Sequence, residues 1–279
     1  MPKSEKNGQV PIFYINLARR PDRRAFMEDQ FNRLGLTAER VEAVTPDDLP
    51  HSDRIKYCNP DRRRWMTETE FACNLSHAMA WRRFLDDGSE HALILEDDAT
   101  LSRSLPSFLG TVRDAAPDIP VIRIETLGGE ARRLGPVEQQ IMPHIALRRC
   151  FTRDAGAGGY LLTRAAAALL IGRTEMKTEL VDAVLFNPFT PLAKILEVRY
   201  CDPALSIQKS CTGDKGAGAA SDLARSRLEK RREQSRRPIR KWAAKIESWI
   251  TYDARVAIDR LRQVGRSDIR PLTVHFKSD

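Results

Sequence analysis

The first 44 residues constrain the fold most strongly, because they predict two strands joined by a helix. Residues 10–17 (VPIFYINL) form a short run rich in β-branched and aromatic residues, which is typical of a buried strand. Pro21 and Asp22 suit the first turn of a following helix, and Gly35 suits its end. Residues 38–44 predict a second strand. A β-α-β opening favours a parallel sheet with helices on its faces, so we expect an α/β fold.

The rest of the chain divides into further elements and a tail. We expect a loop over 45–66, a helix from the capping sequence Thr67-Glu68-Thr69-Glu70 to Gly88, and strands over 91–95 and 121–124. A strand beginning at Tyr160 and a helix over 164–171 follow. The Gly-rich segment 213–221 predicts a linker. The expected organisation is therefore a domain over 10–212, this linker, and a basic helical tail over 222–279.

Charge and composition limit the classes of protein. The chain has 279 residues with 46 Lys/Arg and 38 Asp/Glu, and residues 225–270 alone hold 15 and 6 of them, so the basic excess belongs to the tail. No stretch approaches the roughly 18 apolar residues of a transmembrane helix. The polar residues 1–9 lack the apolar run of a secretory signal, so we expect a cytoplasmic protein. Five scattered cysteines without a C-x-x-C pair argue against a disulfide framework or a structural zinc site.

The strand over 91–95 runs directly into three acids, Glu96, Asp97 and Asp98. In open α/β sheets, ligands bind beyond the carboxyl ends of the strands. Mg²⁺ or Mn²⁺ relieves the repulsion between neighbouring carboxylates and can bridge the two phosphates of a nucleotide-sugar. We expect Asp98 as a direct metal ligand, Glu96 as a direct or water-mediated ligand, and Asp97 as a ribose contact or structural group. The alternative is a solvated turn whose acids cap the next helix.

A series of motifs over about residues 10–212 resembles glycosyltransferase family 25, which includes bacterial lipooligosaccharide galactosyltransferases and collagen hydroxylysine galactosyltransferases. The motifs are residues 13–24 (FYINL followed by RPDRR), 39–44 (ERVEAV), 70–77 (EFACNLSH), 93–98 (LILEDD), 158–166 (GGYLLTRAA), 181–182 (VD) and 203–210 with Gln208. The resemblance implies a GT-A-type α/β fold, here with a mostly parallel sheet, and a UDP-sugar donor, with galactose favoured and glucose next. It also implies a divalent metal and inversion at the anomeric carbon. The chain departs from the pattern at Ala72, where the family has Gly, and at 45–48, where the usual D-G is absent.

The donor is expected to contact residues from several of these motifs. Each of these residues also has an alternative role that needs no ligand. Asn16 could cap a turn, Arg20 and Arg23 could be solvated helix arginines, Ser76 and His77 could be core residues, and Gly158 and Gly159 could form a tight turn. Arg24 could pair with the diphosphate in place of Arg20 or Arg23. The set that we expect to bind the nucleotide-sugar comprises Asn16, Arg20, Arg23, Ser76, His77, Asp97, Gly158 and Gly159. Cys73 is expected to pack in the core rather than to act as a nucleophile.

An inverting transfer needs a carboxylate that takes the proton from the acceptor hydroxyl. Asp182 is the first candidate because it matches the later acid of the family, and Glu179 and Asp154 are reserves. A second metal ligand or a helix cap is the alternative role for Asp182.

The tail carries Trp242, Ile246, Trp249 and Ile250 at helical spacing among basic residues. Such a helix suits an anionic membrane surface, and its alternatives are packing on the domain or on a second subunit as a homodimer. The expected function is a metal-dependent, inverting transfer of a hexose from a UDP-sugar to a lipopolysaccharide or other surface glycan, at the inner face of the cytoplasmic membrane. Two alternatives are a nucleic-acid-binding protein that uses the Arg-rich tail and a sugar-nucleotide-binding protein that has lost catalysis.

Overall fold

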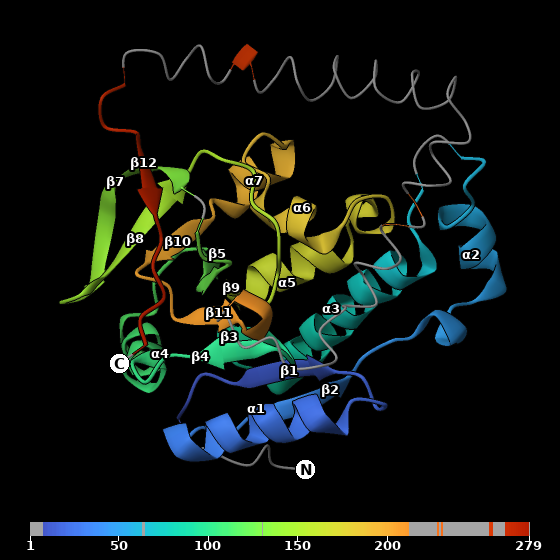
Figure 1. The fold of residues 1–279 in the computed structure, drawn as a ribbon, viewed down its shortest axis with the longest axis horizontal. Helices are drawn as coiled ribbons and strands as arrows, with labels where there is room; N and C mark the ends of the chain where they lie inside the picture. The colour runs from blue at the N-terminus through green and yellow to red at the C-terminus, as the bar shows by residue number, and fades with distance from the viewer. Residues whose placement is uncertain are drawn as a thin grey trace.

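The computed structural model describes residues 8–62, 65–129, 131–211, 228, 230, 257–258 and 266–278. A large sheet forms its centre, with helices on both faces (Figure 1). In spatial order its strands are β12 (Arg270–Thr273), β7 (Ala131–Met142), β8 (Ile145–Cys150), β10 (Arg199–Asp202), β5 (Val121–Arg123), β9 (Gly159–Thr163), β3 (His91–Glu96), β1 (Ile12–Asn16) and β2 (Glu39–Glu42). A small second sheet has the order β4 (Ala99–Leu101), β11 (Ser206–Gln208) and β6 (Glu125–Thr126). The helices are α1 (Pro21–Leu34), η1 (Pro46–Asp48), α2 (His51–Tyr57), α3 (Glu68–Asp87), α4 (Leu105–Ala115), α5 (Arg164–Ile171), η2 (Thr174–Lys177), α6 (Val181–Phe186), α7 (Pro191–Leu196) and η3 (Lys209–Cys211).

The large sheet is mixed. β1 is parallel to both β2 and β3, and β5 is parallel to β10, but β9 lies between β3 and β5 and is antiparallel to both. The edge formed by β8, β7 and β12 is antiparallel throughout. Only β9, β8 and β12 run against the direction of β1, so the expected α/β fold is confirmed and most strands share one direction. The expectation of a mostly parallel sheet included neither β9, the antiparallel strand that separates the two parallel groups, nor the antiparallel edge.

Two hydrophobic cores lie on opposite faces of the sheet. Phe13 and Ile15 of β1 pack in the core that also contains Trp81 of α3 and residues of α5, α6 and α7. Ile12 and Tyr14 pack in the other core, with residues of α1 and α4. Side chains alternate between the faces of a strand, so a strand buried on both faces is continuously apolar, as residues 12–15 are.

The ends of α1 and α3 follow the expected signals. Gly35 adopts a left-handed conformation (φ 64°) after α1, and Thr67 and Glu70 form the capping box of α3 through two side-chain-to-backbone hydrogen bonds of 2.9 and 3.1 Å. The expectation of a loop over 45–66 is wrong in part, because η1 and α2 form there. Since α2 buries none of its residues, it has no apolar stripe that would mark it in the sequence.

Most of the predicted tail lies outside the described residues, including the linker 213–221 and the face formed by Trp242, Ile246, Trp249 and Ile250. Two described parts contact the domain. Lys230 forms an ion pair of 2.8 Å with Glu70, and Arg270–Thr273 pairs with β7 as β12. The prediction of a helical tail up to residue 279 is therefore wrong at 270–273, where pairing with a sheet edge outweighs a weak local pattern.

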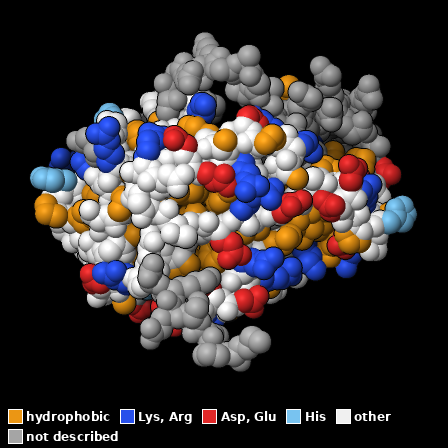
Figure 2. Space-filling view, turned by 90° about the horizontal axis from the view of Figure 1, so that it is seen from below, with side chains coloured by type: hydrophobic (Ala, Val, Ile, Leu, Met, Phe, Trp, Pro, Cys, Tyr) orange, Lys and Arg blue, Asp and Glu red, His pale blue; other side chains and the backbone are white. Residues whose placement is uncertain are grey.

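The helices and the visible surface of the described residues bear on the expectations about membrane spans and charge. No helix in the described ranges is long and apolar enough to cross a membrane. On the face shown in Figure 2, Lys/Arg and Asp/Glu side chains are interspersed. This mixture agrees with a basic excess that lies in residues 225–270.

A cluster of buried charged side chains connects β5, β6, β7 and the segment between β8 and β9. The Arg123 side chain is fully buried, lies 3.0 Å from both Glu125 and Asp154, and stacks 4.5 Å from the centre of the Phe186 ring. Asp154 also pairs with Arg132. Burial raises the pKa of Glu125 to about 7, and the positive charge of Arg123 opposes that rise. Arg123 therefore compensates two buried carboxylates at once.

Arg123→Met is expected to destabilise the protein by about 3–5 kcal/mol, because it removes the arginine that pairs with buried Glu125 and one of the two arginines that pair with Asp154. Urea unfolding followed by circular dichroism measures the change. Arg113→Met is the control, since Arg113 pairs with Asp114 on the exposed surface of α4 and should leave the midpoint unchanged. Equal midpoints for Arg123→Met and the wild type would contradict the compensating role.

Candidate active site

A cavity lies where the sheet order reverses. β2 lies on one side of β1 and β3 on the other, and α1 and α3 cover opposite faces, so the carboxyl ends of β1 and β3 border a crevice. The cavity has a volume of about 180 Å³. Its polar lining includes the expected residues Arg20, Arg23, Ser76, His77, Glu96, Asp97 and Asp98, together with Arg19, Thr69 and Cys73.

Asp97 is held from two sides. The Asn16 amide donates to Asp97 Oδ2 at 2.8 Å, and Arg23 donates to Asp97 Oδ1 at 2.8 Å. The Asn16 side chain is buried, and its Oδ1 accepts from Arg40 Nε at 2.9 Å. Asn16 therefore orients Asp97 and Arg40, and a contact of Asn16 with uracil or ribose stays a prediction. Arg40 was missed because its sequence position does not show that it lies beside Asn16.

Of the three arginines at the start of α1, Arg23 contacts the acids. Arg23 Nη1, which donates to Asp97, also lies 3.3 Å from Asp98 Oδ2. Arg20 lines the cavity and donates to Asp22 at 2.9 and 2.7 Å. Arg24 pairs with Glu28 on the exposed face of α1. The substitute role suggested for Arg24 is therefore the least favoured by position.

The Asp98 carboxylate has a buried oxygen and a raised pKa. Its Oδ1 is buried and has no hydrogen-bond partner within the described structure. Burial, followed by the neighbouring Glu96 carboxylate, raises the pKa of Asp98 to about 7, and Arg23 opposes this rise. An unpartnered carboxylate oxygen beside a second carboxylate is the donor set that a hard divalent cation satisfies. Glu96 and Asp98 thus fit the expected cation.

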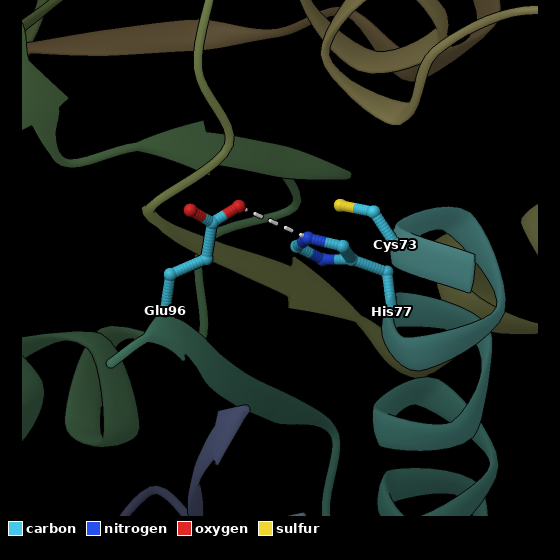
Figure 3. Close-up of side chains that lie close together, drawn as sticks. All are labelled: Cys73, His77 and Glu96. Atoms are coloured by element: carbon cyan, nitrogen blue, oxygen red, sulfur yellow. Dashed lines mark hydrogen bonds and ion pairs between the residues drawn. The ribbon is translucent and has the colours of Figure 1, made fainter. Parts of the chain in front are cut away.

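Ser76 and His77 lie on the face of α3 toward the cavity. Ser76 Oγ donates to Ala72 O at 2.8 Å and accepts from Val44 N at 2.9 Å, which connects the segment after β2 to α3. His77 Nε2 lies 3.3 Å from Glu96 Oε1, and His77 Nδ1 lies 2.9 Å from the Tyr160 hydroxyl. Figure 3 shows the His77 ring and the Glu96 carboxylate pointing toward each other. His77 is therefore coupled to the acid cluster, whereas the hydrogen bonds of Ser76 are structural.

The two glycines are required by protein side chains. A Cβ on Gly158 would lie 2.3 Å from Glu125 Oε1, and a Cβ on Gly159 would lie 2.4 Å from Ser206 Oγ. Gly158 O also accepts from Glu96 N at 3.0 Å. These close approaches explain the glycines without a ligand. A contact with the donor sugar stays a prediction, and neither glycine is among the residues that line the cavity.

The chain matches the model of glycosyltransferase family 25, described as "LPS biosynthesis protein", over residues 9–185. The chain belongs to glycosyltransferase family 25. The expected enzyme class, a glycosyltransferase, is thereby confirmed at the level of the family.

Relatives in the family differ in how much of their length aligns. A "Glycosyltransferase 25 family member" of Drosophila pseudoobscura pseudoobscura is 41% identical over 35% of this chain, which is 17% of its own length. The "Lacto-N-neotetraose biosynthesis glycosyltransferase LgtE" of Neisseria gonorrhoeae is 26% identical over 80% of this chain and 82% of its own. Among solved structures, a "mannose-1-phosphate geranyltransferase" from Thermus thermophilus aligns at a TM-score of 0.39 and 15% identity, over 68% of this chain and 72% of that chain.

The base candidates of this family 25 chain occupy different positions. Asp182 is the second residue of α6, is largely buried, and accepts from Gly156 N at 3.2 Å and Ala183 N at 2.6 Å. Glu179 precedes α6, and its backbone carbonyl accepts from Asn74. Asp154 is committed to Arg123 and Arg132. Neither Asp182 nor Glu179 is among the residues that line the cavity, so the assignment of the base to one of them stays a prediction, and Asp154 is better explained by its ion pairs.

Proposed function

We propose that the chain is a metal-dependent, inverting hexosyltransferase with a GT-A-type site that moves galactose from UDP-galactose to a lipopolysaccharide or other surface glycan. UDP-glucose is the next donor. Family membership supports glycosyl transfer, the family description "LPS biosynthesis protein" supports a lipopolysaccharide acceptor, and the name of the Neisseria gonorrhoeae relative supports a glycan product. The observation that carries the metal and nucleotide part is the buried Asp98 Oδ1, which has no hydrogen-bond partner in the described structure and lies beside Glu96 in the lining of the cavity.

The roles of the residues follow from their positions. Glu96 and Asp98 would hold Mn²⁺ or Mg²⁺, which when bound supplies positive charge for the leaving diphosphate. Asp97 is fixed by Asn16 and Arg23, so it presents a rigid carboxylate edge at the cavity, suited to a ribose hydroxyl. Arg20 lines the cavity and can reach a phosphate through its guanidinium.

On the acceptor side of the reaction, the base is assigned to an acid that does not line the cavity. Asp182 would take the proton from the acceptor hydroxyl as that oxygen attacks the anomeric carbon opposite the leaving UDP. We place the enzyme in the cytoplasm, at the inner face of the membrane, because a lipid-linked glycan and a UDP-sugar meet there. The basic tail would bind that anionic surface, and a homodimer through the tail is the alternative.

UDP binding measured by calorimetry tests the proposal. With Mn²⁺ present we expect binding, and with EDTA we expect affinity to fall about tenfold or more, because a bridging cation links the acids to the diphosphate. Restoring excess Mn²⁺ should restore the affinity. Binding that is equal in Mn²⁺ and EDTA would contradict a metal held by Glu96 and Asp98. Binding without turnover of any UDP-sugar would instead indicate a protein that has lost catalysis.

A further inference from the structure

Three side chains that line the cavity, two from α3 and one from β3, form a cluster of mixed donors. Cys73 Sγ, a ring nitrogen of His77 and a carboxylate oxygen of Glu96 all lie within 4.8 Å of one another. Cys73 and His77 are separated by one helical turn, so they share a face of α3, and Glu96 at the end of β3 faces them (Figure 3). Sulfur, imidazole and carboxylate are the three ligand types that zinc binds in proteins.

We propose that Cys73, His77 and Glu96 form a binding site for Zn²⁺ or a similar thiophilic divalent cation, separate in chemistry from the hard-cation site of Glu96 and Asp98. The ligand atoms of a tetrahedral zinc lie about 3.5 Å apart, given metal–ligand distances of about 2.0–2.3 Å. His77 Nε2 and Glu96 Oε1 already lie 3.3 Å apart. Closing the cluster on a cation therefore needs only a small adjustment of side chains.

The surroundings of His77 suit a metal ligand. Metal-bound histidines use their second ring nitrogen to hydrogen-bond a fixed partner, which sets the tautomer and the ring plane. His77 Nδ1 lies 2.9 Å from the hydroxyl of Tyr160, and that oxygen also accepts from Trp81 Nε1 at 2.9 Å. A phenolic oxygen has two acceptor lone pairs, so it can accept from both. With Nδ1 protonated toward Tyr160, Nε2 presents its lone pair to the cation.

The site has an open side. Cys73, His77 and Glu96 all line the cavity of about 180 Å³, so a water or substrate oxygen can complete the coordination. Selectivity follows from the ligand types, because a thiolate and an imidazole favour Zn²⁺ over Mg²⁺ or Mn²⁺. Glu96 belongs to both proposed sites, so zinc bound here would withdraw it from the cation that the nucleotide needs.

Co²⁺ is the probe, because a thiolate bound to Co²⁺ gives a charge-transfer band in the near ultraviolet. Metal-free full-length protein titrated with Co²⁺ should develop this band to one equivalent, and Zn²⁺ should remove it whereas excess Mg²⁺ should not. Cys73→Ser should abolish the band, and Cys211→Ser, at an exposed cysteine, should keep it. His77→Gln should weaken Co²⁺ binding about tenfold or more.

Asp98→Asn separates this proposal from the hard-cation site, because it should keep the band while it loses metal-dependent UDP binding. Circular dichroism checks that each variant is folded. A wild-type protein without the band, or a folded Cys73→Ser variant that retains it, would overturn the zinc site without affecting the proposed transferase.

Discussion

Asp98→Asn is expected to lower glycosyl transfer about 1,000-fold or more and to weaken UDP binding in Mn²⁺, with the fold intact. The buried Oδ1 of Asp98 has no hydrogen-bond partner in the described structure, and the 3.3 Å contact of Arg23 with Oδ2 is one that an amide oxygen can still accept, so the fold should tolerate the amide. A carboxamide has no charge with which to hold the cation. Loss of about 4 kcal/mol of charge stabilisation at the leaving diphosphate corresponds to this reduction in rate.

Initial rates with UDP-galactose and calorimetry with UDP in Mn²⁺ measure the two effects. Thermal unfolding should show that the variant is at least as stable as the wild type in metal-free buffer, because burial and Glu96 both disfavour the charged form of Asp98. The matched control is Asp114→Asn, at an exposed carboxylate on α4 that pairs with Arg113, which should leave transfer unchanged. Full activity in Asp98→Asn would remove the basis for a metal at this position.

The parts of the fold that could be predicted are those with strong local signals. The β1-α1-β2 opening has a continuous apolar strand, a helix that begins with proline and a glycine that ends it. The capping box predicted the start of α3, and the Ala/Leu-rich segment predicted α5 with its observed bounds. In each case a short stretch of sequence holds all of the residues that determine the element.

The elements that were missed depend on distant contacts. β7 exposes five consecutive residues, 136–140, so it lacks the alternation of a half-buried strand, and its pairing with β8 and β12 supplies the stability. The antiparallel position of β9 between β3 and β5 is determined by tertiary contacts, which no local sequence pattern shows. The four residues of β12 lie at the end of a strongly basic segment, and so short a strand has too few residues to show a strand pattern there.

The candidate site was predictable to the extent that it lies at strand ends. The acids after β3 and the arginines after β1 were found because a strand end marks both positions, and the cavity brings Arg20, Arg23, His77 and the acids together. The partners inside the protein could not be found in this way. Glu125 sets the need for glycine at 158, yet the two residues are 33 positions apart in the sequence, and Glu125 lies in the small sheet whereas Gly158 directly precedes β9 of the large sheet. The Cys73, His77 and Glu96 cluster likewise joins a helix to a strand.

The position of Asp182 links the candidate base to the metal ligands. Its Oδ2 accepts from Gly156 N, and two residues later Gly158 O accepts from Glu96 N at 3.0 Å. One short loop therefore contacts both the candidate base and a candidate metal ligand. A carboxylate held by backbone donors keeps a fixed orientation, which a base needs if it is to meet the acceptor hydroxyl in a defined geometry.

Asp182→Asn is expected to lower the rate of transfer about 100- to 10,000-fold while UDP affinity in Mn²⁺ stays within about threefold, because the amide cannot take a proton at neutral pH. The amide oxygen can still accept from one of the two backbone N–H groups, so the loop should keep its position.

Glu179→Gln is the matched comparison, since Glu179 lies just before α6 and was the second candidate. Single-turnover rates and UDP calorimetry on both variants distinguish three results. Loss of transfer with retained UDP binding in Asp182→Asn alone assigns the base to Asp182, and the same loss in Glu179→Gln alone assigns it to Glu179. Loss of metal-dependent UDP binding in Asp182→Asn would make Asp182 a metal ligand rather than the base.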